Sequence, residues 1–314
     1  MGGSSRVRPT ELNNRHPADI SARRGRRALP FDSMRYILII SLTLAACFGM
    51  QTLALRAVGG RTTKSESNFF SSLGRIQAGA QDKPEAMILG SSVTGRLPDR
   101  AQGIDGWANM GCDGGSAVDA LRAIDEGILP SAPFLVIEAN TLQLALKKEP
   151  TEIGQAMRAP WFKVGLRVSA LSAYARPAAF FYSKLLARRI GDFAAAGSEA
   201  DLGVSSRPRE VTDSPQVALT QREEDLIDEV AAIVKRLKAN GSRTVIVWLP
   251  PARGDQSPPP AWILELARRS EAPYWDLGQE AAPGTVTLTD GVHMAASSAA
   301  RTMTSLQRGL RPEP

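Results

Sequence analysis

The stretch Ala86-Met-Ile-Leu-Gly-Ser-Ser-Val-Thr-Gly95 joins a short apolar run to a glycine and two serines. Short apolar runs without polar alternation are typical of strands that are buried on both faces of a parallel sheet. Open sheets of this kind bind ligands just beyond the carboxyl ends of their strands, where Ser91 and Ser92 fall. The stretch therefore predicts a buried strand with a polar site at its end.

Four further apolar runs have the same character, and amphipathic helical patterns separate most of them. The runs are Trp107–Met110, Phe134–Ile137, Thr244–Leu249 and Tyr274–Leu277, and the helical patterns are Ala117–Gly127, Val217–Ala239, Pro260–Arg269 and Ala295–Leu310. Strands that alternate with helices indicate an α/β fold with a doubly wound parallel sheet. We expect strand order 2-1-3-4-5, with the first strand between the second and the third.

Composition and charge narrow the function classes. The 314 residues are 43% hydrophobic and 22% charged, which is ordinary for a globular protein and excludes wholesale disorder. The net charge of +6 comes mostly from residues 1–35, which hold eight arginines and three acidic residues. From Arg56 onward, 30 basic residues face 29 acidic ones. This near-neutral part lacks the basic footprint of a nucleic-acid-binding protein, so no nucleic-acid partner is expected.

Residues 36–55 form an uncharged, apolar segment of 20 residues, which is long enough for a helix across a hydrocarbon core of about 30 Å. More basic residues precede this segment than follow it, and the heavier positive flank stays cytoplasmic. The pattern predicts a single-pass signal anchor. Residues 1–35 are then a disordered cytoplasmic tail, and the main domain is periplasmic or extracellular.

Three alternatives for this segment stay open. It could be a buried core helix, although a core helix seldom runs this long without a polar face. The sequence Leu44-Ala-Ala-Cys47 also fits a lipoprotein processing box, which would lipidate Cys47, and a cleaved secretory signal is the third alternative. The anchor, the lipoprotein and the cleaved signal all export residues 57–314.

The rest of the chain divides into a stalk and one domain. Residues 56–83 are mostly small and polar and suggest a stalk, with a short helix around Phe69–Ile76. Residues 84–314 form the α/β domain, interrupted by an insertion at about 142–216, between the third and fourth strands. Within the insertion, Trp161–Arg189 is expected to be helical and apolar, and 194–215 to be a loop.

Polar groups follow three of the predicted strands and precede the last helix. The second strand leads into a tight loop at Gly114, and the third leads to Asn140. Asp290 lies three residues before His293, and at this spacing a carboxylate can orient an imidazole as a general base. Each feature alone has an ordinary explanation: a helix cap, a turn, a strand terminator or a surface pair. In the expected strand order, however, the serines lie between Gly114 and Asn140.

These blocks, taken together and in this order, resemble the SGNH hydrolase superfamily of GDSL-type lipases and esterases, which has a flavodoxin-like sheet. The resemblance covers roughly residues 85–310 outside the insertion. It implies that Ser92 is the nucleophile and that His293 is the general base, oriented by Asp290. The oxyanion hole would consist of the backbone N–H groups of Ser92 and Gly114 and the side-chain amide of Asn140. No metal or organic cofactor is implied.

Two blocks depart from the family pattern. Ser91 stands where the Gly-Asp-Ser motif has aspartate, and Glu138-Ala-Asn-Thr141 stands where the family has Gly-x-Asn-Asp. Neither change removes a proton-transfer group, but the first leaves a choice between Ser91 and Ser92 as nucleophile. Cys112 has no second histidine of the folded region to activate it and is expected to be a small packing residue.

The resemblance implies acyl chemistry and leaves three functions open. The first is an esterase that acts on an ester-bearing envelope or extracellular glycan, or on a small ester. The second is an O-acyltransferase, such as an acetyltransferase, that modifies a cell-surface polysaccharide with the same residues, because Gly-Ser-Ser versions with a membrane anchor resemble envelope proteins of that kind. The third is a non-catalytic envelope protein that binds glycan or assembles with polysaccharide-biosynthesis proteins.

Overall fold

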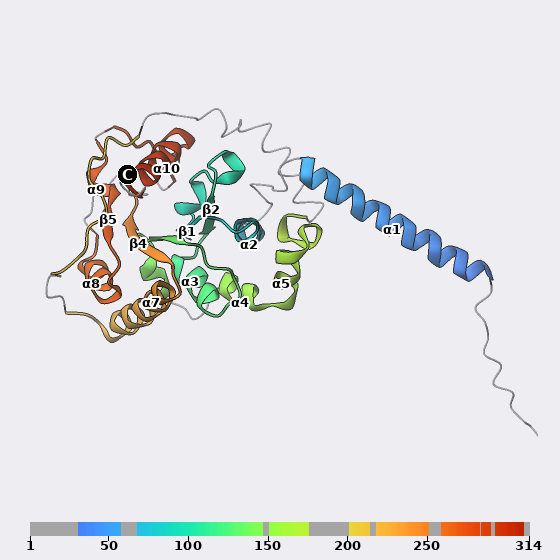
Figure 1. Cartoon of the computed structure of the whole chain (residues 1–314), viewed down its shortest axis with the longest axis horizontal. Coiled ribbons are helices and arrows are strands. Elements are labelled where there is room, and N and C mark those ends of the chain that lie inside the picture. The colour runs from blue at the N-terminus through green and yellow to red at the C-terminus, as the bar shows by residue number, and fades with distance from the viewer. Residues whose placement is uncertain are drawn as a thin grey trace, which may run out of the picture. The chain divides into compact units, whose positions relative to one another are not determined.

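A computed structural model describes residues 31–57, 68–146, 151–175, 201–213, 218–250, 259–282, 284–289 and 293–310. Two units are distinguished, residues 1–47 and residues 48–314, and the second contains the sheet (Figure 1). The predicted tail over 1–35 lies almost wholly outside the described residues, as do part of the insertion and Asp290.

The sheet has five parallel strands in the order β2-β1-β3-β4-β5, which confirms the expected α/β topology. The strands are β1 (Ala86–Ser91), β2 (Trp107–Cys112), β3 (Phe134–Glu138), β4 (Arg243–Trp248) and β5 (Tyr274–Asp276). Each begins within one residue of a predicted run. β1 is therefore flanked by β2 and β3, and the register pairs Ser91 with Cys112 and Leu89 with Ile137.

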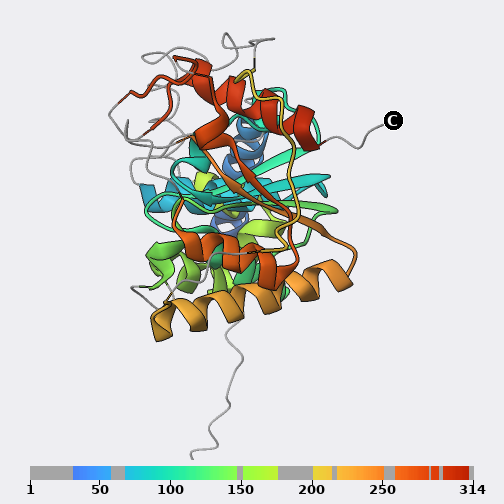
Figure 2. The ribbon, with the colours of Figure 1, turned by 90° about the vertical axis from the view of Figure 1, so that its left-hand side faces the viewer.

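The two faces of the sheet contribute to separate hydrophobic clusters, because successive side chains of a strand point to opposite faces. In β1, Met87 and Leu89 join one cluster and Ile88 joins the other. Figure 2 shows α10 on one side of the sheet and α7 and α8 on the other. The first cluster includes side chains of α2 (Asn68–Ala80), α3 (Ala117–Asp125), α4 (Glu152–Arg158), α5 (Pro160–Arg167), α7 (Gln221–Ala239) and α8 (Ala261–Ser270), and the second includes those of α9 (Leu277–Glu280) and α10 (Ala296–Leu310).

The helix ends follow local capping chemistry. The hydroxyl of Thr220 accepts a hydrogen bond from Glu223 N–H, and the Glu223 side chain bonds back to Thr220 N–H, so α7 begins with a capping box. At the start of α3, the Ser116 hydroxyl accepts a single capping hydrogen bond from Val118 N–H. Four predicted helices thus appear as α3, α7, α8 and α10, each shifted by a few residues at most.

Helix α2 differs from the predicted stalk, because it belongs to the core of the domain. Leu73 and Ile76 are fully buried in the cluster that contains β2. The Gln77 side chain donates to Phe162 O at 3.0 Å and accepts from Ala173 N at 2.7 Å, which joins α2 to the insertion. The domain therefore begins at or before Asn68, and the stalk prediction of residues 56–83 was too long.

In the described part of the insertion, the helix predicted from Trp161 ends at Arg167, and residues 176–189 of that prediction lie outside the described residues. The described part has the short 3₁₀ helix η3 (Leu142–Leu146), then α4, α5 and the 3₁₀ turns η4 (Ser169–Leu171) and η5 (Ala173–Ala175). The predicted loop over 194–215 includes a described part, 201–213, that runs along the edge strand β5. Arg209 and Tyr274 exchange both backbone hydrogen bonds, at 2.9 and 2.8 Å. This bridge covers part of an otherwise open sheet edge.

Helix α1 (Phe31–Ala57) includes the predicted membrane segment. Its stretch Met34–Leu53 is long and apolar enough to cross a membrane, and none of it is buried against the rest of the protein. A core helix would bury these side chains, so the buried-helix alternative is not supported. The lipoprotein and cleaved-signal alternatives remain open, since both would also leave the segment exposed.

Candidate active site

The two serines at the carboxyl end of β1 have different environments. Ser91 is the last residue of the strand and is 2% exposed, whereas Ser92 begins the following turn and is half-buried. No described residue forms a hydrogen bond with the Ser92 hydroxyl. Of the two hydroxyls, the one at position 92 is the accessible one.

Glu138 fixes Ser91 and is fully buried at the end of the neighbouring strand β3. Its carboxyl oxygens accept hydrogen bonds from the Ser91 amide at 2.7 Å and from the Ser91 hydroxyl at 2.9 Å. The Thr94 hydroxyl donates at 2.6 Å, the Thr94 amide at 3.3 Å and the Thr141 hydroxyl at 3.1 Å. Several donors thus compensate the burial of this carboxyl group, as a buried polar group requires.

This network depends on the absence of a side chain at Gly90. A Cβ atom there would lie 2.1 Å from Thr94 Oγ1 and 2.3 Å from Glu138 Oε2. The Ser91 hydroxyl also accepts from Val93 N–H at 3.1 Å, so the turn after β1 is held by both neighbours of Ser92. The Gly-Ser-Ser sequence therefore serves two purposes: the glycine and the first serine accommodate Glu138, and the second serine stays half-buried.

The Gly114 loop follows β2, next to the turn that carries Ser92. Gly114 is exposed and has φ +75°, a left-handed conformation that favours glycine. The preceding Asp113 is held by an amide donation to Ser72 Oγ at 2.8 Å and by an ion pair with Arg75 at 3.5 Å. Arg75 also donates to Gly111 O at 2.6 Å. Helix α2 thus fixes this loop, a contribution that the sequence did not reveal.

Asn140 follows β3 and bonds to the end of β4. Its side-chain amide donates to Leu249 O at 2.9 Å, and its side-chain oxygen accepts from Leu249 N–H at 2.8 Å. A primary amide carries two N–H groups, so one remains available for another acceptor. Asn140 is half-buried at the same sheet edge as Ser92. Asn140 therefore connects the ends of β3 and β4, and its second side-chain N–H group is left to donate to an oxyanion.

His293 lies in the loop before α10. Its carbonyl oxygen accepts from the Thr289 amide at 2.8 Å and from the Thr289 hydroxyl at 3.2 Å, and Leu288 and Met294 form an isolated antiparallel bridge. Met294 is buried in the cluster that also contains Val93, the residue after Ser92. The loop is therefore fixed on the face of the sheet that α10 covers.

The structure places three of the five predicted site residues at the same edge of the sheet. Ser92, Gly114 and Asn140 follow the carboxyl ends of β1, β2 and β3, which are adjacent in the sheet. His293 is fixed on a loop whose next residue shares a cluster with the turn after Ser92. Asp290 lies outside the described residues. A half-buried hydroxyl at the same sheet edge as a glycine loop and a side-chain amide is the set of groups that nucleophilic attack on a carbonyl uses.

Two buried ionisable groups, the Cys112 thiol and the Asp119 carboxyl, lie close to Gly115 in the Gly114 loop. Burial, and after it the charge of Asp119, raises the pKa of the Cys112 thiol far above its usual range. A thiol in this state is not a nucleophile, in agreement with its predicted packing role. Burial also raises the pKa of Asp119, whose carboxyl accepts from the Thr151 hydroxyl at 2.8 Å.

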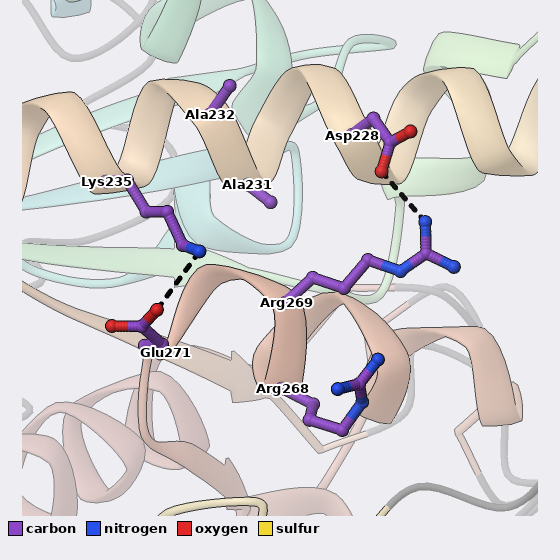
Figure 3. A pocket seen from close by; sticks show the side chains of 7 residues that line it. All are labelled: Asp228, Ala231, Ala232, Lys235, Arg268, Arg269 and Glu271. Carbon is purple, nitrogen blue, oxygen red and sulfur yellow. Dashed lines mark hydrogen bonds and ion pairs between the residues drawn. The ribbon is translucent and has the colours of Figure 1, made fainter.

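A surface groove between α7 and α8 lies apart from these residues (Figure 3). Its basic side chains are all ion-paired: Lys235 with Glu271, Arg268 with Glu265, and Arg269 with Glu224, Asp228 and Glu265. The hydrogen bonds that Arg269 donates to these carboxylates raise its pKa. Because its charges neutralise one another, the groove has the character of a helix interface. Among the described residues, no group of three or more His, Cys, Asp or Glu side chains could hold a metal ion.

No protein-family model, curated protein or solved structure matches this chain.

Sequence reasoning missed the central part that Glu138 plays. A signal was present, since Glu138 ends an otherwise apolar run, and a charged residue on a buried strand requires hydrogen-bonding partners. Its partners could not be identified, because Ser91 and Thr94 lie 47 and 44 residues away in the chain.

Proposed function

We propose that this chain is a membrane-anchored, extracytoplasmic serine esterase of the SGNH hydrolase kind. It would deacylate an ester of a cell-envelope or extracellular glycan through an acyl-serine intermediate. The observation that carries the proposal is that two adjacent serines differ in exposure. Ser91 is buried and hydrogen-bonded to Glu138, while Ser92 is half-buried just after the carboxyl end of β1. Open α/β sheets bind their ligands at this edge.

In the proposed reaction, Ser92 Oγ attacks the ester carbonyl and its proton passes to the His293 imidazole. The new O–C bond creates a tetrahedral oxyanion, which the Gly114 N–H, the Ser92 N–H and the second Asn140 N–H stabilise. The bond to the glycan oxygen then breaks, and His293 returns the proton to this leaving group. Water, deprotonated by His293, hydrolyses the acyl-serine and restores the enzyme. Asp290 would orient the imidazole.

The neighbouring elements support these roles. The Gly114 loop is held by Ser72 and Arg75 of α2, and Asn140 is held by Leu249. Oxyanion donors act best when they are fixed before the reaction, because no free energy is then spent on orienting them. The exposed, apolar α1 and the arginine-rich flank before it support anchoring with the domain outside the cytoplasm.

The test is ester hydrolysis by the full-length chain in detergent micelles, with p-nitrophenyl acetate as the probe. We expect Ser92→Ala and His293→Gln to reduce the rate to the uncatalysed background. Ser131→Ala serves as the matched control, because Ser131 lies just before β3 at the amino edge of the sheet and bonds to Ser242 at 2.7 Å. Hydrolysis that survives in Ser92→Ala would contradict the assignment.

The same assay separates hydrolysis from transfer. An esterase releases acetate from its acyl-serine in water alone, whereas an O-acyltransferase releases it efficiently only when a glycan acceptor is added. Accumulation of acyl-enzyme that an added polysaccharide discharges would establish the transferase alternative with the same residues. Binding of polysaccharide without any covalent step would establish the non-catalytic alternative.

A further inference from the structure

Helix α5 and the turn after it carry an apolar surface that faces solvent. Trp161, Val164, Val168 and Leu171 are 43%, 44%, 37% and 53% exposed. Trp161 and Val164 are three residues apart and share one side of α5, whereas Val168 and Leu171 lie in the extended residue and 3₁₀ turn that follow the helix. Beyond α1, no other described large hydrophobic side chain is exposed. A surface helix normally turns its polar side outward, so this surface is unusual for a domain in water.

The inner side of α5 packs against the domain and is buried. Phe162 is completely buried, and Gly165 lies so close to α2 that a Cβ atom would be 2.3 Å from Gln77 Nε2. The helix therefore cannot rotate to hide its outer side without breaking the contact with α2. The exposure of Trp161 and Val164 follows from the way in which α5 is fixed.

The two exposed charged side chains of α5, Lys163 and Arg167, are both positive, while Arg158 of α4 is paired with Glu126. Residues 153–191 contain seven basic residues and no acidic residue. Of the 30 basic residues from Arg56 onward, 23 remain elsewhere, where they face all 29 acidic residues. Lys163 and Arg167 are exposed on α5, and neither forms an ion pair with a described residue. An uncompensated basic, apolar surface with a tryptophan is complementary to an anionic lipid surface.

The chain also keeps this surface near a membrane if α1 is an anchor. Helix α1 ends at Ala57 and α2 begins at Asn68, so ten residues join them. Ten residues span at most about 35 Å, even when fully extended. Since α5 packs on α2, its outer side lies within reach of the bilayer that α1 would cross.

We propose that the surface formed by Trp161, Lys163, Val164, Arg167, Val168 and Leu171 docks on the anionic lipid bilayer. Trp161 lies at the level of the lipid headgroups, the aliphatic side chains contact the upper acyl chains, and the two basic side chains meet lipid phosphates. Docking fixes the domain on the membrane surface instead of leaving it on a free tether. The inference rests on the proposed anchor and is independent of the proposed acyl chemistry.

The experiment places an environment-sensitive fluorophore, NBD, at Val164→Cys in the full-length chain with Cys47→Ser. Cys112 is buried and its raised pKa keeps it unreactive. The matched control is Ala232→Cys, an exposed position on α7. Both proteins are reconstituted in vesicles of phosphatidylcholine alone or with phosphatidylglycerol, each with and without brominated acyl chains, and insertion of α1 is followed by flotation.

With phosphatidylglycerol present, we expect a blue-shifted emission at position 164 and several-fold stronger quenching by brominated lipid than at position 232. Each basic side chain contributes about fivefold to binding at an anionic surface, so Lys163→Gln with Arg167→Gln should return the quenching toward that in phosphatidylcholine alone. Equal quenching at positions 164 and 232 in floated protein would overturn the docking alone.

Two other outcomes also have a defined meaning. A blue shift at position 164 that is the same in detergent and in both lipids, without bromolipid quenching, would show that protein covers this surface, either residues 176–200 or a second copy, and would overturn the inference. Protein that fails to float with the vesicles would overturn the anchor and this inference together.

Discussion

Glu138 accepts a hydrogen bond from the backbone amide of Ser91 at 2.7 Å and another from its hydroxyl at 2.9 Å. The two residues end adjacent strands, β3 and β1, and are 47 positions apart in the chain. The bonds fix the last residue of β1, and with it the start of the turn that carries Ser92. A single buried carboxyl thereby holds Ser91 in the interior, while Ser92 stays half-buried.

Removal of this carboxyl should destabilise the domain. Glu138→Ala leaves the Ser91 and Thr94 donors buried without partners, and each orphaned donor costs about 1–3 kcal/mol. We expect a loss of about 3–5 kcal/mol in the free energy of unfolding, measured by urea denaturation. Glu138→Gln keeps one acceptor oxygen and should lose less. The exposed Glu210→Ala should change stability by less than about 0.5 kcal/mol, and an equal change at both positions would be inconsistent with the network.

The neighbouring serines should respond oppositely to alanine substitution. Ser91→Ala removes buried hydrogen bonds and should lower the unfolding free energy by about 1–2 kcal/mol, while esterase activity is retained in the folded fraction. Ser92→Ala removes an accessible hydroxyl and should leave stability nearly unchanged while activity disappears. Thermal unfolding and ester hydrolysis, measured on the same preparations, check both. Activity lost only in Ser91→Ala would reverse the assignment.

Substitution of Asn140 is expected to lower both the stability of the fold and the turnover number. Asn140→Ala removes one oxyanion donor, which typically lowers turnover about a hundredfold or more, through a loss of about 3 kcal/mol in the transition state. It also orphans Leu249 N–H and O, so the melting temperature should fall. The measurement is kcat per folded molecule, counted by circular dichroism. An unchanged kcat with a lowered melting temperature would assign Asn140 to the strand connection alone.

Two aspartates of α3, Asp119 and Asp125, should contribute to the free energy of unfolding with opposite dependence on pH. Burial raises the pKa of Asp119, so the stability that this group contributes is present below its unfolded pKa and is lost as the pH rises through its folded pKa. Asp119→Asn should therefore gain stability relative to the parent as the pH rises. Hydrogen bonds from Arg236 lower the pKa of Asp125, so Asp125→Asn should lose stability at neutral pH, and the loss should vanish toward acid. Because the Asp125 pair is largely exposed, its effect should be below about 1 kcal/mol.

Urea unfolding at pH 4.5 and at pH 7.5 tests both signs at once. A difference between Asp119→Asn and the parent that does not change between the two pH values would refute the burial effect. The same result for Asp125→Asn would refute the contribution of Arg236.

The sheet could be predicted from the sequence because parallel strands buried on both faces appear as continuous apolar runs. The start of α7 was harder to place: the helical pattern extends back to Val217, and the helix begins only at Gln221, after the cap formed by Thr220 and Glu223. Its predicted end, Ala239, is the observed one, and Asn240-Gly241 follows it directly. Local sequence patterns therefore predicted the strands and helices, and the strand order then placed Ser92, Gly114 and Asn140 at one edge of the sheet.

Long-range contacts could not be predicted in the same way. The apolar side of α2 consists of few residues in a polar stretch, so only its packing on β2 reveals that Leu73 and Ile76 belong to the core. The bridge between Arg209 and Tyr274 joins an irregular segment to an edge strand and leaves no periodic pattern. The choice between Ser91 and Ser92 likewise depends on Glu138, a residue of another strand.

The most direct test of the central claim is intact-mass analysis of the full-length chain after reaction with a fluorophosphonate, beside the Ser91→Ala and Ser92→Ala variants. The account predicts one covalent adduct in the parent and in Ser91→Ala, none in Ser92→Ala, and peptide mapping to Ser92. An adduct that persists in Ser92→Ala, or no adduct in a folded parent protein, would contradict it.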